Sequence, residues 1–386
     1  MGIAYPVPEM QIVQPQTVEQ LREALVEAQR SGRRITLGGA FSKRRMGGPV
    51  APSEVIISTA SLDRVLQYEP RDLTLSVEAG MPYAELSRLL DQHGQMLPLD
   101  PPFAEAATIG GVLAANTSGP RRRLYGTARD LVIGMKFVTL QGRLVESGGM
   151  VVKNVAGLDL AKLLIGSFGT LAVIAVANFK VLPKPPGTRT FLRNFASHRE
   201  ALEARDRLLA SPLQPAAVDL LNPAAARLVG YDGWLLAVEA VGNAAALARY
   251  GREFPSDFTL ESGEEAQFWR NVQNFTPCFL ERNPQAAVVR VCCTLSGIAE
   301  VANSTEAPLV IRAGNGVCYA HFSSADEAAA WIRPDWKAVI EFAPEERKGE
   351  LELWPSPGED LAVMRRIKQN FDPDGLLNPG RLYGRI

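Results

Sequence analysis

The chain has 386 residues, of which 46% are hydrophobic and 22% are charged, and its net charge at pH 7 is −1. These values are typical of a globular protein with two domains, and the near-zero charge argues against a broad nucleic-acid or membrane surface. The four cysteines, Cys278, Cys292, Cys293 and Cys318, lack C-x-x-C spacing, which argues against a zinc site, an iron–sulfur cluster or a disulfide framework.

No targeting or membrane-spanning segment is predicted. The sequence does not open with a basic region followed by an apolar one. The longest apolar run, residues 163–176, is interrupted by Gly166 and Gly169 and is shorter than the ~20 residues of a spanning helix. We therefore expect reduced thiols and a cytoplasmic location.

The first predicted elements are a helix and a strand that ends in a glycine turn. Thr17 is placed to cap the helix and Gly32 to end it. The strand of residues 34–37 runs into the sequence GGAFS at 38–42, followed by Lys43. Two glycines and a hydroxyl residue after a strand predict a turn that exposes N–H donors, although an ordinary tight loop has the same pattern.

A second small-residue segment, ATIGGVLAANTSGPRRRLYG at 107–126, follows strands at 55–58 and 73–78 and a helix at 83–90. Its glycines and alanines would fill a core poorly, but they allow backbone N–H groups to approach a phosphate-bearing cofactor closely. A tightly packed helix start is the alternative interpretation. The arginines at 121–123 have three possible interpretations: a docking patch for a partner, cations that offset the cofactor phosphates, or a solvated loop.

The rest of the chain predicts a hairpin, a domain boundary and a second domain. A strand at 131–140 returns at Val145, and the prolines and glycine of 183–187 mark the boundary. Alternating strands and helices beyond it favour an antiparallel sheet with helices on one face. The predicted strands are 190–195, 217–221, 234–240, 288–295, 309–312, 317–322 and 336–340, and the predicted helices are 199–209, 244–254, 325–332 and 357–371.

Several familiar sites are excluded by their missing motifs. The sequence has no G-x-G-x-x-G after a strand, no Walker A lysine, no H-E-x-x-H and no G-x-S-x-G. A Rossmann nicotinamide site, a P-loop, a zincin site and an α/β-hydrolase elbow are therefore not expected.

The order of the remaining motifs resembles the FAD-linked oxidases of the vanillyl-alcohol oxidase type. The segments GPRRRLYGTARDLVIGMKFV, VVKNVAGLDLAKLLIGSFGTL and FDPDGLLNPGRLY are most similar to the flavin-binding subunits of glycolate oxidase. The resemblance covers residues 6–186 and the C-terminal tail. It implies an α+β fold with a two-subdomain PCMH-type FAD-binding domain at 1–187, an antiparallel α+β cap domain at 188–335 and a C-terminal segment at 336–386 that returns to the flavin.

The resemblance also implies a set of FAD contacts. Some family members carry a histidine bound covalently to the flavin in the pyrophosphate turn, where this chain has Ala40 and Phe41, so non-covalent FAD is expected. The implied contacts are Gly38, Gly39, Ala40, Phe41 and Ser42 at the pyrophosphate, Thr108, Gly110, Gly111, Asn116 and Gly119 along the pyrophosphate and ribityl chain, Arg123, Tyr125 and Gly126 in the next loop, Ile174 at the adenine, and Asn378 and Arg381 near the ring.

Candidates for catalysis are few. The 2-hydroxy-acid dehydrogenases of this superfamily carry a histidine-rich metal motif in the cap, but the comparable residues 312–321 lack the histidine pair, so no metal is predicted. His321 is the one candidate base, and Arg312 or Arg381 is the candidate to bind a carboxylate. Packing would also explain His321, and solvation would also explain Arg381.

Together the resemblance implies an FAD-binding subunit of a glycolate oxidase-like complex, which takes part in oxidation of the small 2-hydroxy acid glycolate to glyoxylate and in electron transfer. Its partners would be a second FAD-binding subunit and an iron–sulfur subunit, with any contact to the inner membrane made through the complex. No nucleic-acid partner is expected. Two alternatives remain: a self-sufficient FAD-dependent 2-hydroxy-acid dehydrogenase, and an architectural subunit with little flavin chemistry.

Overall fold

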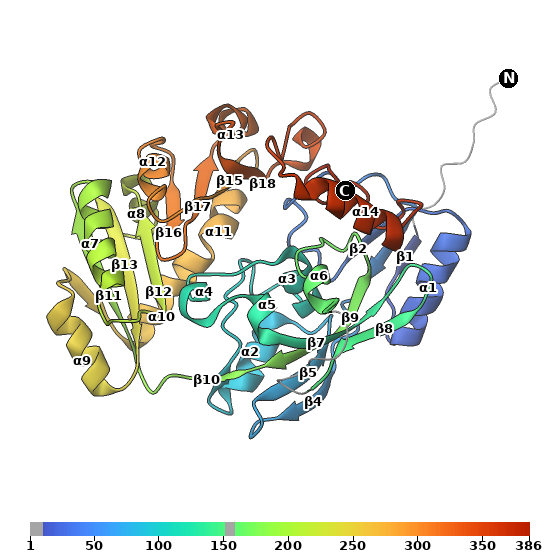
Figure 1. The fold of residues 1–386 in the computed structure, drawn as a ribbon, viewed down its shortest axis with the longest axis horizontal. Helices are drawn as coiled ribbons and strands as arrows, with labels where there is room; N and C mark the ends of the chain where they lie inside the picture. Colours follow the sequence, from blue (N-terminus) through green and yellow to red (C-terminus); the bar gives the residue numbers. More distant parts are fainter. Residues whose placement is uncertain (1–10, 151–158) are drawn as a thin grey trace.

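Four sheets organise the part of the chain that the computed structural model describes, residues 11–150 and 159–386. Lys153, Asn154 and Gly157, which contribute to the family resemblance, lie outside this part. Figure 1 shows two bodies, one built around the β1–β9 region and one around the β11–β18 region, with the chain crossing between them at β10 (Leu182–Pro183). No helix among the described residues is long and apolar enough to cross a bilayer.

The first subdomain is a small parallel sheet covered by one helix. Its strand order is β1-β3-β2, and both pairings are parallel. The helix α1 forms as predicted, with the Thr17 side chain accepting from the N–H of Gln20, and it buries Leu21 and Leu25 against the sheet. The elements are β1 (Gln11–Val13), α1 (Val18–Arg30), β2 (Ile35–Gly38) and β3 (Val55–Ser58).

The second subdomain is an antiparallel sheet of order β4-β5-β9-β7-β8. Helices α2 and α3 pack on it through a core that includes Leu86, Ile109 and Phe179. The predicted hairpin is confirmed as β7 and β8. The elements are β4 (Val65–Glu69), β5 (Thr74–Glu78), α2 (Tyr83–Asp91), β6 (Gln95–Met96), α3 (Ile109–Ala115), α4 (Arg122–Tyr125), α5 (Ala128–Leu131), β7 (Val132–Val138), β8 (Leu144–Gly148), α6 (Ala161–Leu164) and β9 (Val173–Lys180).

The cap is an antiparallel sheet of order β14-β11-β13-β12-β16-β17-β15-β18, which begins at Thr188, directly after the predicted boundary. Its strands are β11 (Thr188–Phe195), β12 (Ala217–Leu221), β13 (Trp234–Val241), β14 (Phe258–Leu260), β15 (Ala287–Cys292), β16 (Leu309–Arg312), β17 (Val317–Phe322) and β18 (Lys337–Phe342). Its helices are α7 (His198–Ala210), α8 (Pro223–Leu228), α9 (Ala244–Glu253), α10 (Ser262–Gln273), α11 (Phe275–Arg282), α12 (Ile298–Ala302) and α13 (Ala325–Trp331).

Helices cover both faces of the cap sheet, so the prediction of helices on one face is wrong. Helices α7, α9, α12 and α13 pack on the face that carries Phe191 and Val218, whereas α8, α10 and α11 pack on the face that carries Leu192 and Leu221. In Figure 1, α10 and α11 lie on the side of the cap toward the first body, and α7 and α9 lie on the outer side.

The C-terminal segment returns to the first subdomain after Phe342. Strand β18 pairs with β15, so the cap sheet extends past residue 335, where the resemblance placed its end. Local pattern identifies a strand at this place but not its partner, which explains the shift. The helix α14 (Asp360–Phe371) then leads to Leu377, which pairs with Ile35 in parallel and brings the tail beside β2. The α+β class is confirmed.

Candidate functional site

A cavity of about 550 Å³ lies at the carboxyl end of the parallel sheet, where ligands commonly bind in open α/β layers. Its wall is formed by the turn after β2, the start of α3, the start of β9 and the C-terminal tail. The structure brings eleven of the predicted contacts to this cavity: Gly38, Gly39, Ala40, Phe41, Ser42, Thr108, Gly110, Gly111, Ile174, Asn378 and Arg381.

The turn after β2 supplies free backbone donors. The N–H groups of Gly39, Ala40, Phe41 and Ser42 donate to no acceptor within residues 11–150 and 159–386. Phe41 has a φ of 53°, in the left-handed region, and such a residue curls successive N–H groups into a concave anion-binding nest. The turn therefore has the donor set of a phosphate site.

The start of α3 contributes differently from the prediction. The N–H of Gly110 donates to Ala79 O at 2.7 Å, and the N–H of Gly111 donates to Thr108 Oγ1 at 3.3 Å. These amides already have protein acceptors. A Cβ on Gly110 would lie 2.8 Å from the Cβ of Ala79, so this glycine permits α3 to pack closely on the end of β5. The small residues leave room for a ligand but do not supply the donors.

The predicted contact loop at 119–126 does not reach this cavity. Gly119 is buried, and a Cβ there would lie 2.4 Å from Asp100 O. Gly126 has a φ of 80° and ends α4, and Tyr125 lines a separate cavity on the cap side. The physical reason is that this loop packs the two bodies together.

The arginines at 121–123 have three different environments. The Arg121 guanidinium forms a two-bonded ion pair with the buried carboxylate of Asp100. Arg123 crosses to the cap, where its Nη1 donates to Pro215 O at 2.6 Å. Arg122 lines a second cavity. Two of the three arginines therefore hold the protein together rather than form a free docking patch.

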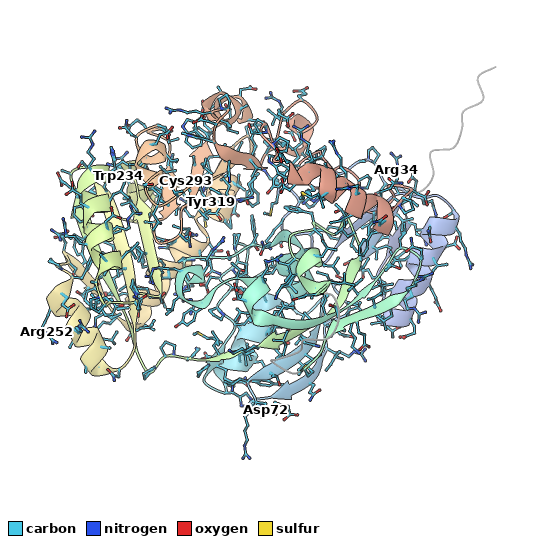
Figure 2. All side chains as sticks on the ribbon, in the orientation of Figure 1. Arg34, Asp72, Trp234, Arg252, Cys293 and Tyr319 are labelled. Atoms are coloured by element: carbon cyan, nitrogen blue, oxygen red, sulfur yellow. The ribbon has the colours of Figure 1, made fainter. Side chains whose placement is uncertain are left out.

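The second cavity, of about 570 Å³, lies between the end of α3 and the inner side of the cap sheet. Asn116, the left-handed C-cap of α3, lines it rather than the first cavity. Tyr319 on β17 also lines it, and Figure 2 shows this residue on the part of the cap that faces the first body. Ala115 and Phe168 line both cavities, so the two lie side by side.

Arg312 is held rigidly at the wall of the second cavity. Its Nη1 pairs with the carboxylate of Asp219 on β12, and its guanidinium carbon lies 5.8 Å from the ring centre of Tyr319. The residue is 7% exposed, and its Nη2 donates to no group in the described part of the chain. Its Nε is also buried without a hydrogen-bond partner among the described residues. A fixed cation with unused donor nitrogens is suited to bind a small anion.

His321 lies in the same cavity but is a weak base. Burial lowers its pKa to about 4, so the ring is neutral at pH 7. Its Nδ1 lies 3.1 Å from Pro308 O, and because a carbonyl can only accept, the proton is on Nδ1. Its Nε2 then accepts from the Thr276 hydroxyl at 2.9 Å. The lone pair that a general base would use is therefore already occupied.

The low pKa of His321 predicts a loss of stability in acid. The unfolded chain protonates this ring near pH 6.5 and the folded chain only near pH 4, so stability from this residue is full above pH 6.5 and is lost as the pH falls toward 4. Between pH 7.5 and pH 5 the wild-type chain is expected to lose about 2 kcal/mol more than His321→Gln in urea unfolding. Equal losses in the two proteins would contradict the assigned ring state.

Arg381 is neither a solvated tail residue nor a free cation. Its guanidinium donates to the carbonyls of Lys43, Arg44 and Gly48 at 2.7, 3.0 and 3.1 Å. Burial lowers its pKa to about 10. Arg381 lines the first cavity and ties the tail to the segment that follows the donor turn.

Lys43 is a cavity residue that the predicted contact set omits. It lines the first cavity, is 9% exposed, and its Nζ has no hydrogen-bond partner in the described part of the chain. The sequence did contain a signal, because the residue directly follows GGAFS. Within the same part of the chain, no three His, Cys, Asp or Glu side chains are grouped so that they could hold a metal ion.

Two family models match the chain, one near its N-terminus and one near its C-terminus. The model described as "FAD binding domain" matches residues 10–148, and the model described as "FAD linked oxidases, C-terminal domain" matches residues 355–382. The two matched segments contain most of the first-cavity wall, including the donor turn, the start of α3 and Asn378.

Curated relatives extend over nearly the whole chain. Glycolate oxidase subunit GlcE of Escherichia coli (strain K12) is 26% identical over 91% of this chain and 93% of that protein. Glycolate oxidase subunit GlcD of Bacillus subtilis (strain 168) is 24% identical over 97% and 89%. The mitochondrial D-lactate dehydrogenase [cytochrome] of Arabidopsis thaliana is 28% identical over 90% and 68%.

Solved structures share the fold. The 4-ethylphenol oxidase from Gulosibacter chungangensis superposes with a TM-score of 0.73 at 15% identity, covering 98% of this chain and 90% of that one. An alkyldihydroxyacetonephosphate synthase superposes with a TM-score of 0.70 at 19% identity, covering 95% and 75%. With the free donors of the first cavity, these findings confirm the resemblance to the FAD-linked oxidases: residues 10–148 match an FAD-binding domain, residues 355–382 match the C-terminal domain of that family, and the whole chain is similar to flavin-dependent oxidoreductases.

Proposed function

We propose that this chain is the FAD-binding subunit of a glycolate oxidase-like complex and takes part in the oxidation of glycolate, a 2-hydroxy acid, to glyoxylate. The observation that carries the proposal is a cavity with free backbone donors beside a second cavity in which His321 is neutral and hydrogen-bonded through both ring nitrogens. Similarity to GlcE over nearly the full length of both chains supports the same assignment.

In this proposal the first cavity holds the FAD diphosphate and adenine, and the second holds the ring and a small acid. The donor turn would bind the diphosphate, Ile174 would contact the adenine, and Asn378 would hold the tail over the cofactor. When bound, FAD supplies the redox chemistry of the subunit. The chain contributes donors, apolar walls and the placement of the ring against the cap.

The FAD is proposed to be held non-covalently. The pyrophosphate turn has Ala40 and Phe41 at the place of the attached histidine of some family members. Free flavin should therefore leave the protein when the fold is lost.

The proposed partners are a second FAD-binding subunit, which oxidises the acid, and an iron–sulfur subunit, which takes electrons onward. The second cavity offers a cation in Arg312 but a poor base in His321, and a hydroxy acid needs both a cation at its carboxylate and a base at its hydroxyl. Without a suitable base in this chain, oxidation of the acid would fall to the second subunit, and this chain would take part through its flavin.

A self-sufficient 2-hydroxy-acid dehydrogenase is the second candidate, favoured by one observation. Arg312 and His321 line the same cavity, which places a carboxylate-binding cation and an imidazole near one ligand. In that case the His321 ring would have to exchange its hydrogen bond with Thr276 for one with the substrate hydroxyl.

The spectrum of the purified chain distinguishes these functions. We expect flavin absorption that is released into the supernatant by acid precipitation, and no bleaching when glycolate is added without oxygen. Dithionite, added afterwards, should bleach the flavin and so serves as the positive control. Bleaching by glycolate alone would support the self-sufficient dehydrogenase, flavin retained in the precipitate would contradict non-covalent binding, and a colourless folded chain that takes up no FAD would indicate an architectural subunit.

A further inference from the structure

Lys43 is a buried cation whose charge is not balanced. It is 9% exposed, and its Nζ is enclosed without a hydrogen-bond partner among the described residues. Burial lowers its pKa to about 8 and is the one cause of the shift, with no charged neighbour acting on it. An enclosed ammonium without an acceptor is costly, so such a group is normally paired.

The other charged side chains around the cavity do not balance Lys43. Arg381 is committed to three backbone carbonyls, and Arg44 is exposed. Glu345, the one acid that lines the described wall, accepts from the Nζ of Lys348 at 2.8 Å and from the N–H of Val50 at 3.2 Å. The wall therefore carries more positive than negative charge.

The residues directly before Lys43 also have no negatively charged partner among residues 11–150 and 159–386. The N–H groups of Gly39 to Ser42 form the nest of unused donors, and Lys43 follows them in the same turn. Unpaired N–H groups and an unpaired ammonium on one cavity segment create a positive potential that favours an anion over a neutral ligand. A diphosphate carries two negative charges, which neutral donors alone leave without a counter-charge.

We propose that Lys43 is the residue that pairs with the diphosphate of the bound cofactor, supplying the one buried counter-charge at the nest. This inference rests on the proposed function, since it takes FAD as the ligand. It assigns to Lys43 a role in affinity for the phosphate groups and none toward the flavin ring. Removal of Lys43 should therefore weaken the binding of ligands that contain phosphate and leave the binding of other ligands unchanged.

The test compares FAD with riboflavin, which has the ring and the ribityl chain but no phosphate. Dissociation constants are measured by flavin fluorescence for the full-length wild type, Lys43→Met, Lys43→Gln and Lys43→Arg. Loss of a charge-assisted bond should weaken FAD binding about ten- to hundred-fold in the Met and Gln variants. Riboflavin should change less than about two-fold, and Lys43→Arg should be intermediate for FAD. The control is Lys136→Met, at a half-buried lysine that is paired with Glu146 on the second subdomain, and it should bind FAD as the wild type does.

The melting temperature is a second measurement. It distinguishes a phosphate-binding lysine from one that stabilises the fold, because the two predict opposite changes in the flavin-free variant. Without flavin, Lys43→Met should melt at or above the wild-type temperature, because the substitution removes an unpaired buried charge. With FAD, the rise in melting temperature should be smaller in the variant than in the wild type. A lysine needed for the fold would instead lower the melting temperature of the flavin-free variant.

The outcomes separate this inference from the proposed function. The assignment of Lys43 is overturned if Lys43→Met and Lys43→Gln bind FAD as tightly as the wild type does. It is also overturned if the substitutions weaken the binding of FAD and of riboflavin by the same factor. In both cases FAD binding by the wild type stands. If the wild type takes up neither flavin, the proposed function falls and the assignment of Lys43 falls with it.

Discussion

Substitution of Gly39 by alanine is expected to weaken FAD binding about ten- to hundred-fold, so that the purified variant loses most of its colour. A Cβ at this position would lie 2.1 Å from Thr108 Oγ1 and 3.0 Å from the Cβ and Cγ2 atoms of the same side chain. Thr108 cannot swing away freely, since it is β-branched and its oxygen caps α3 by accepting from Gly111 N–H. The donor turn must therefore move, and overpacking of this kind costs about 1–3 kcal/mol.

The dissociation constant for FAD, measured by flavin fluorescence, checks this result. Gly263→Ala on α10 is the matched control, because a Cβ there meets no atom within 4 Å. The double variant Gly39→Ala/Thr108→Ala removes Oγ1 and Cγ2 of Thr108 and leaves only the Cβ contact at 3.0 Å. It should recover part of the affinity for FAD, although loss of the cap costs about 1 kcal/mol. Wild-type affinity in Gly39→Ala alone would refute the close approach of the turn to α3.

Substitution of Asn378 is expected to open the cofactor cavity from the tail side. Its Oδ1 accepts from Leu37 N–H at 2.7 Å, and its Nδ2 donates to Leu37 O at 3.2 Å and to Phe168 O at 2.9 Å. One side chain that is 3% exposed therefore links the tail, β2 and the segment before β9. Asn378→Ala leaves buried backbone groups without partners, which should lower the free energy of unfolding by about 2–4 kcal/mol.

Asn378→Asp keeps the shape of the side chain and should be at least as damaging as Asn378→Ala. A carboxylate can still accept from Leu37 N–H, but it places negative charge against the carbonyls of Leu37 and Phe168. Both variants should melt at a lower temperature than the wild type, lose FAD and be cleaved faster by protease near the tail. Asn271→Ala, an exposed asparagine on α10 bonded to Gln267, is the control and should match the wild type. Retention of FAD and of the wild-type melting curve by both Asn378 variants would rule out the linking role.

Local sequence patterns predict the turn after β2 well because its chemistry is local. Two glycines and a serine directly after a strand are typical of a turn whose N–H groups point outward, and in the described part of the chain these N–H groups have no acceptor, as expected. The same reasoning placed donors at Gly110 and Gly111, and there it was wrong. The acceptor of Gly110 is Ala79 O, which lies 31 positions earlier in the chain, and such a partner is not visible in a local pattern.

The prediction that the separate segments form one cavity came from the family resemblance and not from periodicity. Asn378 meets Leu37 across 341 positions of sequence, and no spacing rule could predict that contact. Helices α10 and α11 were missed for a related reason. Pro277 lies within α11 and Gly263 within α10, and both residues weaken a helical pattern that packing against β11 and the first body then stabilises.

The link between Asn378 and Leu37 has a consequence for biosynthesis. Because the cap, residues 188–342, is inserted between the two parts of the cofactor site, a nascent chain carries the donor turn long before it carries its closing residue. The amides at 39–42 emerge from the ribosome more than 330 positions ahead of Asn378, so the whole cap is synthesised while the cavity is still open on the tail side. Stable flavin capture is therefore a late event in the maturation of this protein, and a chain terminated within the cap would carry the nest but not the closure.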